Sequence, residues 1–175
     1  EATIVSELFK FAESGQLYRG AKPVMWSPVE KTALAEAEIE YEDIVSTQID
    51  VAFGIVESAI PELVGAYAVV WTTTPWTIPV NQGIAYSPEV EYVLLSAEGE
   101  HILVAEPLIG PFKERSGHAH LQPVKHVKGA DLAGTIARHP MHKLGGFFAK
   151  PRPFLPGEFV TTDQGTGLVH MAPDH

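Results

Sequence analysis

The stretch WTTTPWTIPVNQGIAY, Trp71 to Tyr86, places three consecutive threonines against a proline and between two tryptophans. The apolar run AYAVVW before the threonines and GIAY at the end of the stretch are both typical of strands. Pro75 interrupts the pattern, so we expect one strand to end at the threonines and another to begin after a turn. Because strand side chains alternate, Thr72 and Thr74 are predicted to face one way and Thr73 the other.

Short apolar runs separated by turn residues continue along the chain on both sides of this stretch. They predict strands over 49–56, 66–72, 83–86, 91–97, 101–106, 158–162 and 167–172. Glu98-Gly99-Glu100 predicts a hairpin turn. Helices are few, with one over 3–14 and a short one within 105–117. The expected fold class is therefore α+β, predominantly β, with a barrel-like or strongly bent sheet core and peripheral helices.

Two patterns near the start of the chain predict further local structure. Ser27, Pro28 and Glu30 have the spacing of a helix N-cap, a first-turn proline and a capping box. Over residues 37–42, apolar residues alternate with glutamates, which predicts an extended segment with one solvated face.

Composition bounds the classes of protein to consider. The 175 residues are 45% hydrophobic and 19% charged, which is globular composition, and no apolar run is long enough to span a membrane. The absence of cysteine excludes disulfides and thiolate metal sites, and fits a reducing compartment. The net charge of −10 is uneven, because residues 106–175 hold eight of the 12 basic side chains and six of the 22 acidic ones. A polyanion is therefore expected to approach only this later part.

A second candidate site is the sequence DQGTGLVHMAPDH, Asp163 to His175. Gly165 and Gly167 bracket Thr166, which predicts a tight turn whose backbone N–H groups can approach a ligand closely. His170 follows on a predicted strand.

Taken together, WTTTPWTIPVN and the later GTGLVHMAP resemble the editing domain of isoleucyl-tRNA synthetases, the connective polypeptide inserted into the class I catalytic core. YRGAKPVMWSPVEKTALAEAEIEYED is similar to the entry of that insertion, and IDVAF to another family stretch. Editing domains of leucyl and valyl enzymes typically carry Arg-Pro and an acidic residue where this chain has Thr74-Pro75-Trp76, and Met or Lys at the position of His170. The resemblance implies one editing domain over 1–175, with 1–45 as the entry segment near the junction to the catalytic core.

The activity implied by the resemblance is post-transfer editing, the hydrolysis of the ester of valine mischarged on tRNA for isoleucine. One methylene separates the two amino acids and is worth roughly 1–3 kcal/mol in an apolar pocket, so a second pocket that excludes isoleucine by steric overlap is a harsher filter. Matched positions imply catalytic roles for Thr74, His170 and Thr73. They imply substrate binding by Trp71, Thr72, Trp76, Asn81, Gly165, Thr166 and Gly167.

The same resemblance implies partners and a location. The partners are the 3′-terminal adenosine of a tRNA carrying valine and the catalytic core of the same polypeptide, in a cytoplasmic monomer that does not contact a membrane. No cofactor and no metal is implied in this domain. Ser27 and Glu30 stand where some relatives have a cysteine pair, which excludes a zinc knuckle there. The family motif continues to an aspartate beyond His175, and Asp174 does not match it, so the isolated chain is expected to edit weakly or not at all.

Two alternative functions remain open from the residues themselves. The chain can be a non-catalytic, acidic, β-rich interaction module. It can also be an unrelated metal-dependent hydrolase that uses the pairs His118/His120 and His139/His142 as zinc ligands.

Overall fold

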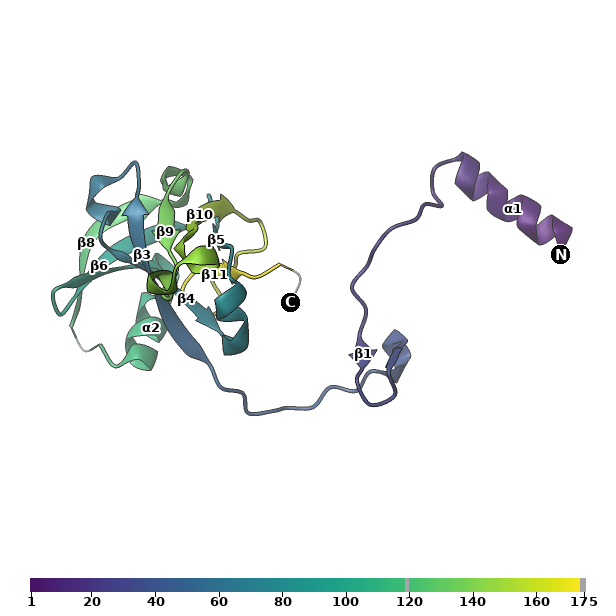
Figure 1. The fold of residues 1–175 in the computed structure, drawn as a ribbon, viewed down its shortest axis with the longest axis horizontal. Coiled ribbons are helices and arrows are strands. Elements are labelled where there is room, and N and C mark those ends of the chain that lie inside the picture. Colours follow the sequence, from purple (N-terminus) through teal and green to yellow (C-terminus); the bar gives the residue numbers. More distant parts are fainter. Residues whose placement is uncertain (119, 174–175) are drawn as a thin grey trace. The chain divides into compact units, whose positions relative to one another are not determined.

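The computed structural model describes residues 1–118 and 120–173, so Asp174 and His175 lie outside the described residues. The chain divides into two compact units, Glu1–Val45 and a larger one that begins at Ser46. Figure 1 shows α1 and the short hairpin of the first unit, and the sheet of the second.

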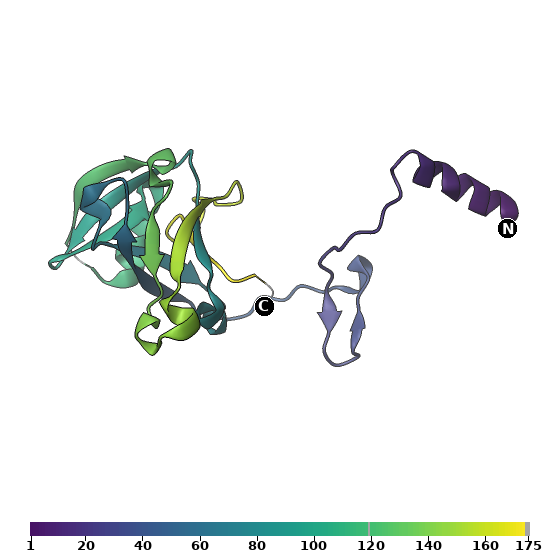
Figure 2. The same ribbon diagram turned by 45° about the horizontal axis from the view of Figure 1, so that its top comes forward.

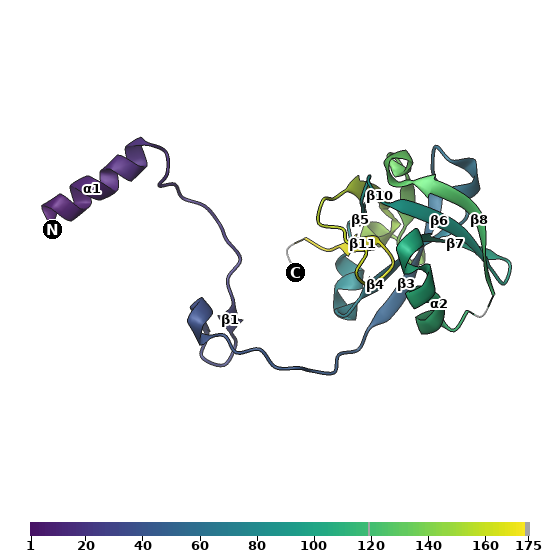
Figure 3. The same cartoon turned by 180° about the vertical axis from the view of Figure 1, so that it is seen from behind.

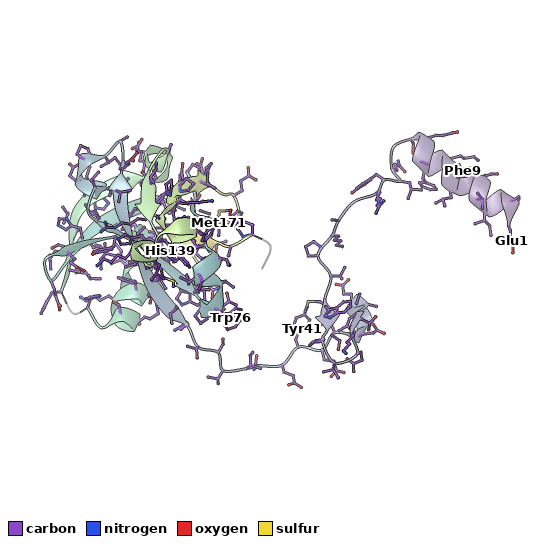
Figure 4. All side chains as sticks on the ribbon, viewed as in Figure 1. Glu1, Phe9, Tyr41, Trp76, His139 and Met171 are labelled. Atoms are coloured by element: carbon purple, nitrogen blue, oxygen red, sulfur yellow. The ribbon has the colours of Figure 1, made fainter. Side chains whose placement is uncertain are left out.

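The first unit contains one helix and one hairpin. The predicted helix is confirmed as α1, Ala2–Glu13, and none of its residues is buried. Its apolar side chains, such as Phe9 in Figure 4, are exposed. The helix expected after Ser27 is wrong, because β1 (Trp26–Ser27) and β2 (Thr32–Ala33) form an antiparallel hairpin there.

The hairpin explains why the capping pattern at Ser27 is not followed by a helix. The backbone N–H of Glu30 does donate to Ser27 Oγ at 3.2 Å, as in a capping box. Lys31, however, has a φ of 56°, and this left-handed residue turns the chain back instead of continuing a helix. The extended segment expected over 37–42 is also wrong. A 3₁₀ turn, η1 (Glu36–Glu38), occupies its start, and no described strand pairs with the rest.

The second unit is built on one nine-stranded sheet with the order β11-β5-β10-β9-β3-β4-β7-β6-β8. Neighbouring strands are antiparallel except for the parallel pairs β4–β7 and β5–β10. The strands are β3 (Ile49–Glu57), β4 (Tyr67–Thr72), β5 (Gly83–Tyr86), β6 (Glu91–Ala97), β7 (Glu100–Ala105), β8 (Leu121–Lys128), β9 (Ile136–Arg138), β10 (Pro151–Pro156) and β11 (Leu168–Met171).

Helical segments of the second unit are short. The α-helix α2 (Ile109–Ser116) buries Phe112, and Figure 3 shows it against the sheet. The remaining turns are 3₁₀ helices: η2 (Pro61–Leu63), η3 (Pro75–Val80), η4 (Glu106–Leu108), η5 (Gly129–Leu132), η6 (His142–Leu144) and η7 (Gly146–Ala149). In the described residues no helix is long and apolar enough to cross a membrane.

The sheet is open at its edges but bends until the segment before β11 reaches β4 and β7. The Thr166 hydroxyl donates to the carbonyl of Val69 on β4 at 2.5 Å, and the N–H of Ala105 on β7 donates to the carbonyl of Thr166 at 2.8 Å. Apolar side chains fill the inside of the bend, among them Phe53, Leu94 and Leu103. The expected predominantly β fold with a strongly bent sheet is therefore confirmed.

In the second unit, three strands were not predicted and one predicted strand is absent. Figure 2 shows β9 and β10 side by side, where the prolines suggest loops. Pro151 and Pro153 occupy alternate positions of β10, which leaves Phe154 N–H free to donate to the carbonyl of Thr135 at 2.9 Å. Residues 158–162, expected as a strand, instead form an unpaired turn. β8 was also missed, because its polar residues and Pro123 hide the alternation.

Candidate functional site: a threonine–glycine cavity

The threonines after β4 and the Gly-Thr-Gly turn before β11 line one cavity of about 350 Å³, which we call the threonine–glycine cavity. The bend of the sheet brings together these segments, which lie far apart in the sequence. Eight predicted site residues line the cavity: Trp71, Thr72, Thr73, Thr74, Gly165, Thr166, Gly167 and His170. Phe159, Thr161, Gln164, Leu168, Val169 and Ala172 complete the lining.

The threonine wall shows the alternation that the sequence predicts. The hydroxyls of Thr72 and Thr74 lie 3.1 Å apart in a hydrogen bond, so they share one side, and Thr74 N–H donates to Thr72 Oγ1 at 3.0 Å. Thr73 is exposed, and its hydroxyl has no hydrogen-bond partner in the described part of the chain. Two hydroxyls are thus held in place, and the third is available to a ligand.

His170 is held by two side chains from the proline turn η3 and its end. The Thr77 hydroxyl donates to the carbonyl of Thr74 at 2.8 Å, so its oxygen accepts the Nε2–H of His170, also at 2.8 Å. With the proton on Nε2, Nδ1 is an acceptor, and the Asn81 amide donates to it at 3.3 Å. This network defines both the tautomer and the orientation of the imidazole. The ring is therefore held in one orientation where it lines the cavity.

The glycine wall, residues 165–167, presents backbone to the cavity at its two glycines. Gly165 and Gly167 have φ values of 80° and 76°, a region that favours glycine. A Cβ on Gly167 would lie 2.3 Å from the Cβ of Ala105, so no other residue fits there. The Tyr92 hydroxyl donates to the carbonyl of Gly167 at 2.8 Å. Burial of Tyr92 raises the pKa of its phenol to about 12, so it remains a neutral donor.

An ion pair supports the same wall from outside the cavity. Arg115 on α2 donates to both carboxylate oxygens of Asp50 on β3, at 2.8 and 3.0 Å, and also to the carbonyl of Gly165 at 3.1 Å. The two side chains are only 19% and 22% exposed. A bidentate pair of this kind has a defined geometry, so it connects the glycine turn to both a helix and a strand.

Two predicted site residues stand apart from the cavity lining. Asn81 is fully buried behind His170, and its amide also donates to the carbonyl of Gly83 at 2.8 Å. Trp76 is 72% exposed and does not line the cavity; Figure 4 labels its position. Trp71, by contrast, lies against Gly165 and donates from Nε1 to Gln48 at 3.0 Å.

Several site residues were missed from the sequence. Thr77 carries a weak signal, since it follows the threonine run by three residues and can reach back to the carbonyl of Thr74. Asp50 and Arg115 carry none, because their pairing exists only once β3 and α2 are packed together.

The ring nitrogens of the pair His139/His142 are hydrogen-bonded to the backbone. His139 is fully buried, donates from Nε2 to the carbonyl of Ile78 at 2.8 Å, and accepts the N–H of Met141 on Nδ1 at 3.0 Å. Burial lowers its pKa below the ordinary value of 6.5. His142 donates from Nδ1 to the carbonyl of His139 at 2.9 Å. Within residues 1–118 and 120–173, no group of three or more histidines and carboxylates is arranged to hold a metal ion.

Comparison with known proteins identifies the family. The model of the family described as tRNA synthetases class I (I, L, M and V) matches residues 1–164. The chain belongs to this family. It is 61% identical over its whole length to an isoleucine--tRNA ligase of Zymomonas mobilis and 50% identical to one of Gluconobacter oxydans. The chain spans 19% of the length of each relative.

The resemblance of this synthetase chain to isoleucyl-tRNA synthetases is therefore confirmed. A solved structure described as GlLeuRS-CP1 shares the fold, with a TM-score of 0.52 and 24% identity. The match covers 62% of this chain and 40% of that one. It supports the sheet architecture and carries no residue roles.

Proposed function

We propose that the threonine–glycine cavity hydrolyses the ester of valine mischarged on tRNA for isoleucine. The observation that carries the proposal is the single cavity shared by the threonine run and the Gly-Thr-Gly turn. These are the two segments on which the resemblance to isoleucyl editing domains rests. In this proposal the partners are the 3′-terminal adenosine of the tRNA and the rest of the synthetase, acting in the cytoplasm as a monomer, with no cofactor.

The chemistry asked of the cavity is modest because an aminoacyl ester is already activated. Among the described lining residues there is no Asp, Glu, Lys or Arg. Hydrolysis then depends on positioning a water molecule and on offering donors to the developing oxyanion. Thr73 has an uncommitted hydroxyl for this, and Thr74 and the oriented ring of His170 place the water or the ester.

The glycine wall suits the nucleoside end of the substrate. Gly165, Thr166 and Gly167 let the substrate approach the backbone closely, and Trp71 and Thr72 border the same space. Asn81 acts from behind by orienting His170. We assign no contact with the substrate to Trp76, for which the resemblance alone implies one.

Hydrolysis of valyl-tRNA, with isoleucyl-tRNA as the matched control, tests the proposal. We expect the full-length ligase that contains this region to hydrolyse the valyl ester and spare the isoleucyl ester. His170→Ala and Thr74→Ala should each lower the rate by about 100-fold, because a misplaced reacting group costs that much. Near-wild-type rates in both variants would reject these roles.

A binding measurement separates this proposal from a non-catalytic interaction module. A non-hydrolysable valyl-adenosine analogue, titrated into the 175-residue chain, should shift the NMR signals of Trp71, Thr73 and His170. This chain is expected to bind the analogue even if it hydrolyses the ester weakly. Shifts confined to a distant surface, with none at the cavity, favour the interaction module.

A further inference from the structure

A second hollow of about 350 Å³ lies in the larger unit and shares no lining residue with the threonine–glycine cavity. We call it the cationic hollow. Its lining residues are Ala52, Gly54, Tyr67, Arg138, His139, Pro140, His142 and Lys143. Neither the proposed hydrolysis nor the resemblance uses these residues.

The floor of the cationic hollow is a row across three strands. Arg138 on β9 is the register neighbour of Gly54 on β3, which is in turn the neighbour of Tyr67 on β4. A Cβ on Gly54 would lie 3.2 Å from Arg138 Nε, so the missing side chain gives the guanidinium room to lie across β3. Arg138 and Tyr67 thus line the same hollow from the two strands on either side of Gly54.

The charge of this hollow is opposite to that of the chain. Every formally charged side chain among its described lining residues is basic, although the net charge of the chain is −10. Arg138 and Lys143 make no ion pair within residues 1–118 and 120–173. Asp50, two residues before Ala52 on β3, is already paired with Arg115 at 2.8 Å. Unpaired cations around a concave surface attract an anion.

The position of the hollow indicates which kind of anion it binds. His139 lines the hollow and also donates to the carbonyl of Ile78 in η3, the turn that follows the threonines of the other cavity. This hydrogen bond links the hollow to the turn that follows the threonines, so we infer that a nucleic-acid strand whose last nucleoside enters the threonine–glycine cavity places an earlier nucleotide at the hollow. Single-stranded nucleic acid is typically bound by cations along the backbone and by an aromatic ring under a base or sugar.

We propose that the cationic hollow binds a phosphodiester of single-stranded RNA. Arg138 and Lys143 contact the phosphate, and the half-exposed Tyr67 packs against the neighbouring base or sugar. The proposal rests on the proposed function for the identity of the partner, because the RNA is the 3′ end of the same tRNA. Binding and hydrolysis are measured separately, so either proposal can fail alone.

The first experiment measures the affinity of the 175-residue chain for a short single-stranded oligoribonucleotide that ends in adenosine, at several salt concentrations. Arg138→Ala/Lys143→Ala should weaken binding several-fold. The slope of log affinity against log salt concentration should become shallower by about 0.7 for each phosphate that the variant no longer neutralises. Lys113→Ala/Lys128→Ala removes the same charge from α2 and β8 and is the matched control. Equal weakening by both pairs, or no RNA binding by the unaltered chain, would overturn the proposal.

A second variant keeps every charge and tests the geometry. Gly54→Ala introduces a methyl group 3.2 Å from Arg138 Nε and should displace the guanidinium, weakening RNA binding at an unchanged melting temperature. Inorganic phosphate should compete only weakly, since it lacks the base that stacks on Tyr67. Unchanged RNA affinity in Gly54→Ala would contradict the placement of Arg138. If the unaltered protein binds the RNA but does not hydrolyse the valyl ester, only the proposed function is rejected and the proposed RNA site stands.

Discussion

The two walls of the threonine–glycine cavity are built on different physical principles. The threonine wall presents the side chains of Thr72, Thr73 and Thr74, of which the first and third are joined by a hydrogen bond between their hydroxyls. Thr77 supports this wall from behind by donating to the carbonyl of Thr74. The glycine wall presents backbone, tied to β4, β6 and β7 through Thr166 and the Tyr92–Gly167 bond. Side-chain changes should therefore affect activity on the first wall, whereas added volume should affect folding on the second.

The largest expected effect comes from adding a methyl group to the glycine wall. Gly167→Ala combines a left-handed φ with a Cβ placed 2.3 Å from Ala105 Cβ, and should cost roughly 2–6 kcal/mol of unfolding free energy. Denaturant unfolding measures this cost. Gly134→Ala, also at positive φ but with open space around its Cβ, is the control for backbone strain alone. Equal destabilisation of the two variants would show that the close approach to Ala105 is unimportant.

The next effect should be a large loss of activity, with a stability cost of about 1–3 kcal/mol for the buried polar groups left without a partner. Thr77→Val keeps the shape of the side chain but removes the oxygen that accepts the Nε2–H of His170. If the ring positions the ester, valyl-tRNA hydrolysis by the full-length ligase should fall by about 100-fold, mainly in kcat. Thr135→Val, a buried threonine outside the cavity, is the matched control. A wild-type rate in Thr77→Val would mean that the orientation of His170 does not matter.

A smaller effect is expected from pH, through the residue that anchors the threonine wall. The pKa of His139 is lowered in the folded state by burial, so below pH 6.5 the unfolded chain binds a proton that the folded chain resists. The contribution of His139 to stability is thus complete above pH 6.5 and is lost as the pH falls below that value. Unfolding free energies measured between about pH 7.5 and 5 should decline, with a smaller slope in His139→Gln. Identical slopes in the unaltered chain and in His139→Gln would show that His139 does not cause the pH dependence of stability.

The smallest effect is expected at Trp76. This side chain is 72% exposed and lies outside the cavity lining, so Trp76→Ala should leave both hydrolysis and melting temperature nearly unchanged. Trp71→Ala is the variant to compare with it, because Trp71 lies against Gly165 and connects the two walls. A large decrease in the hydrolysis rate of Trp76→Ala would indicate a substrate contact that the isolated chain does not display.

The accuracy of the sequence predictions follows from the range of the interactions involved. The strands 49–56, 66–72 and 91–97 were found because each is a short apolar run bounded by turn residues. The Gly-Thr-Gly turn was found because glycine marks positive φ locally. The helix after Ser27 was wrong because the capping contact also fits a hairpin turn, and Lys31 decides between the two. β10 was missed because prolines at alternate positions resemble a loop until a partner strand is present.

The sequence alone determined the chemical content of the site: three threonines before a proline, a glycine turn, and a histidine on the following strand. These are local features, encoded by neighbouring residues and legible without a partner. Only the tertiary structure decided that Thr77 and Asn81 hold the imidazole, that Arg115 and Asp50 brace the glycine turn, and that Trp76 lies outside the cavity. Those relations join residues far apart in the chain, and they exist because the sheet bends enough to bring β11 against β4.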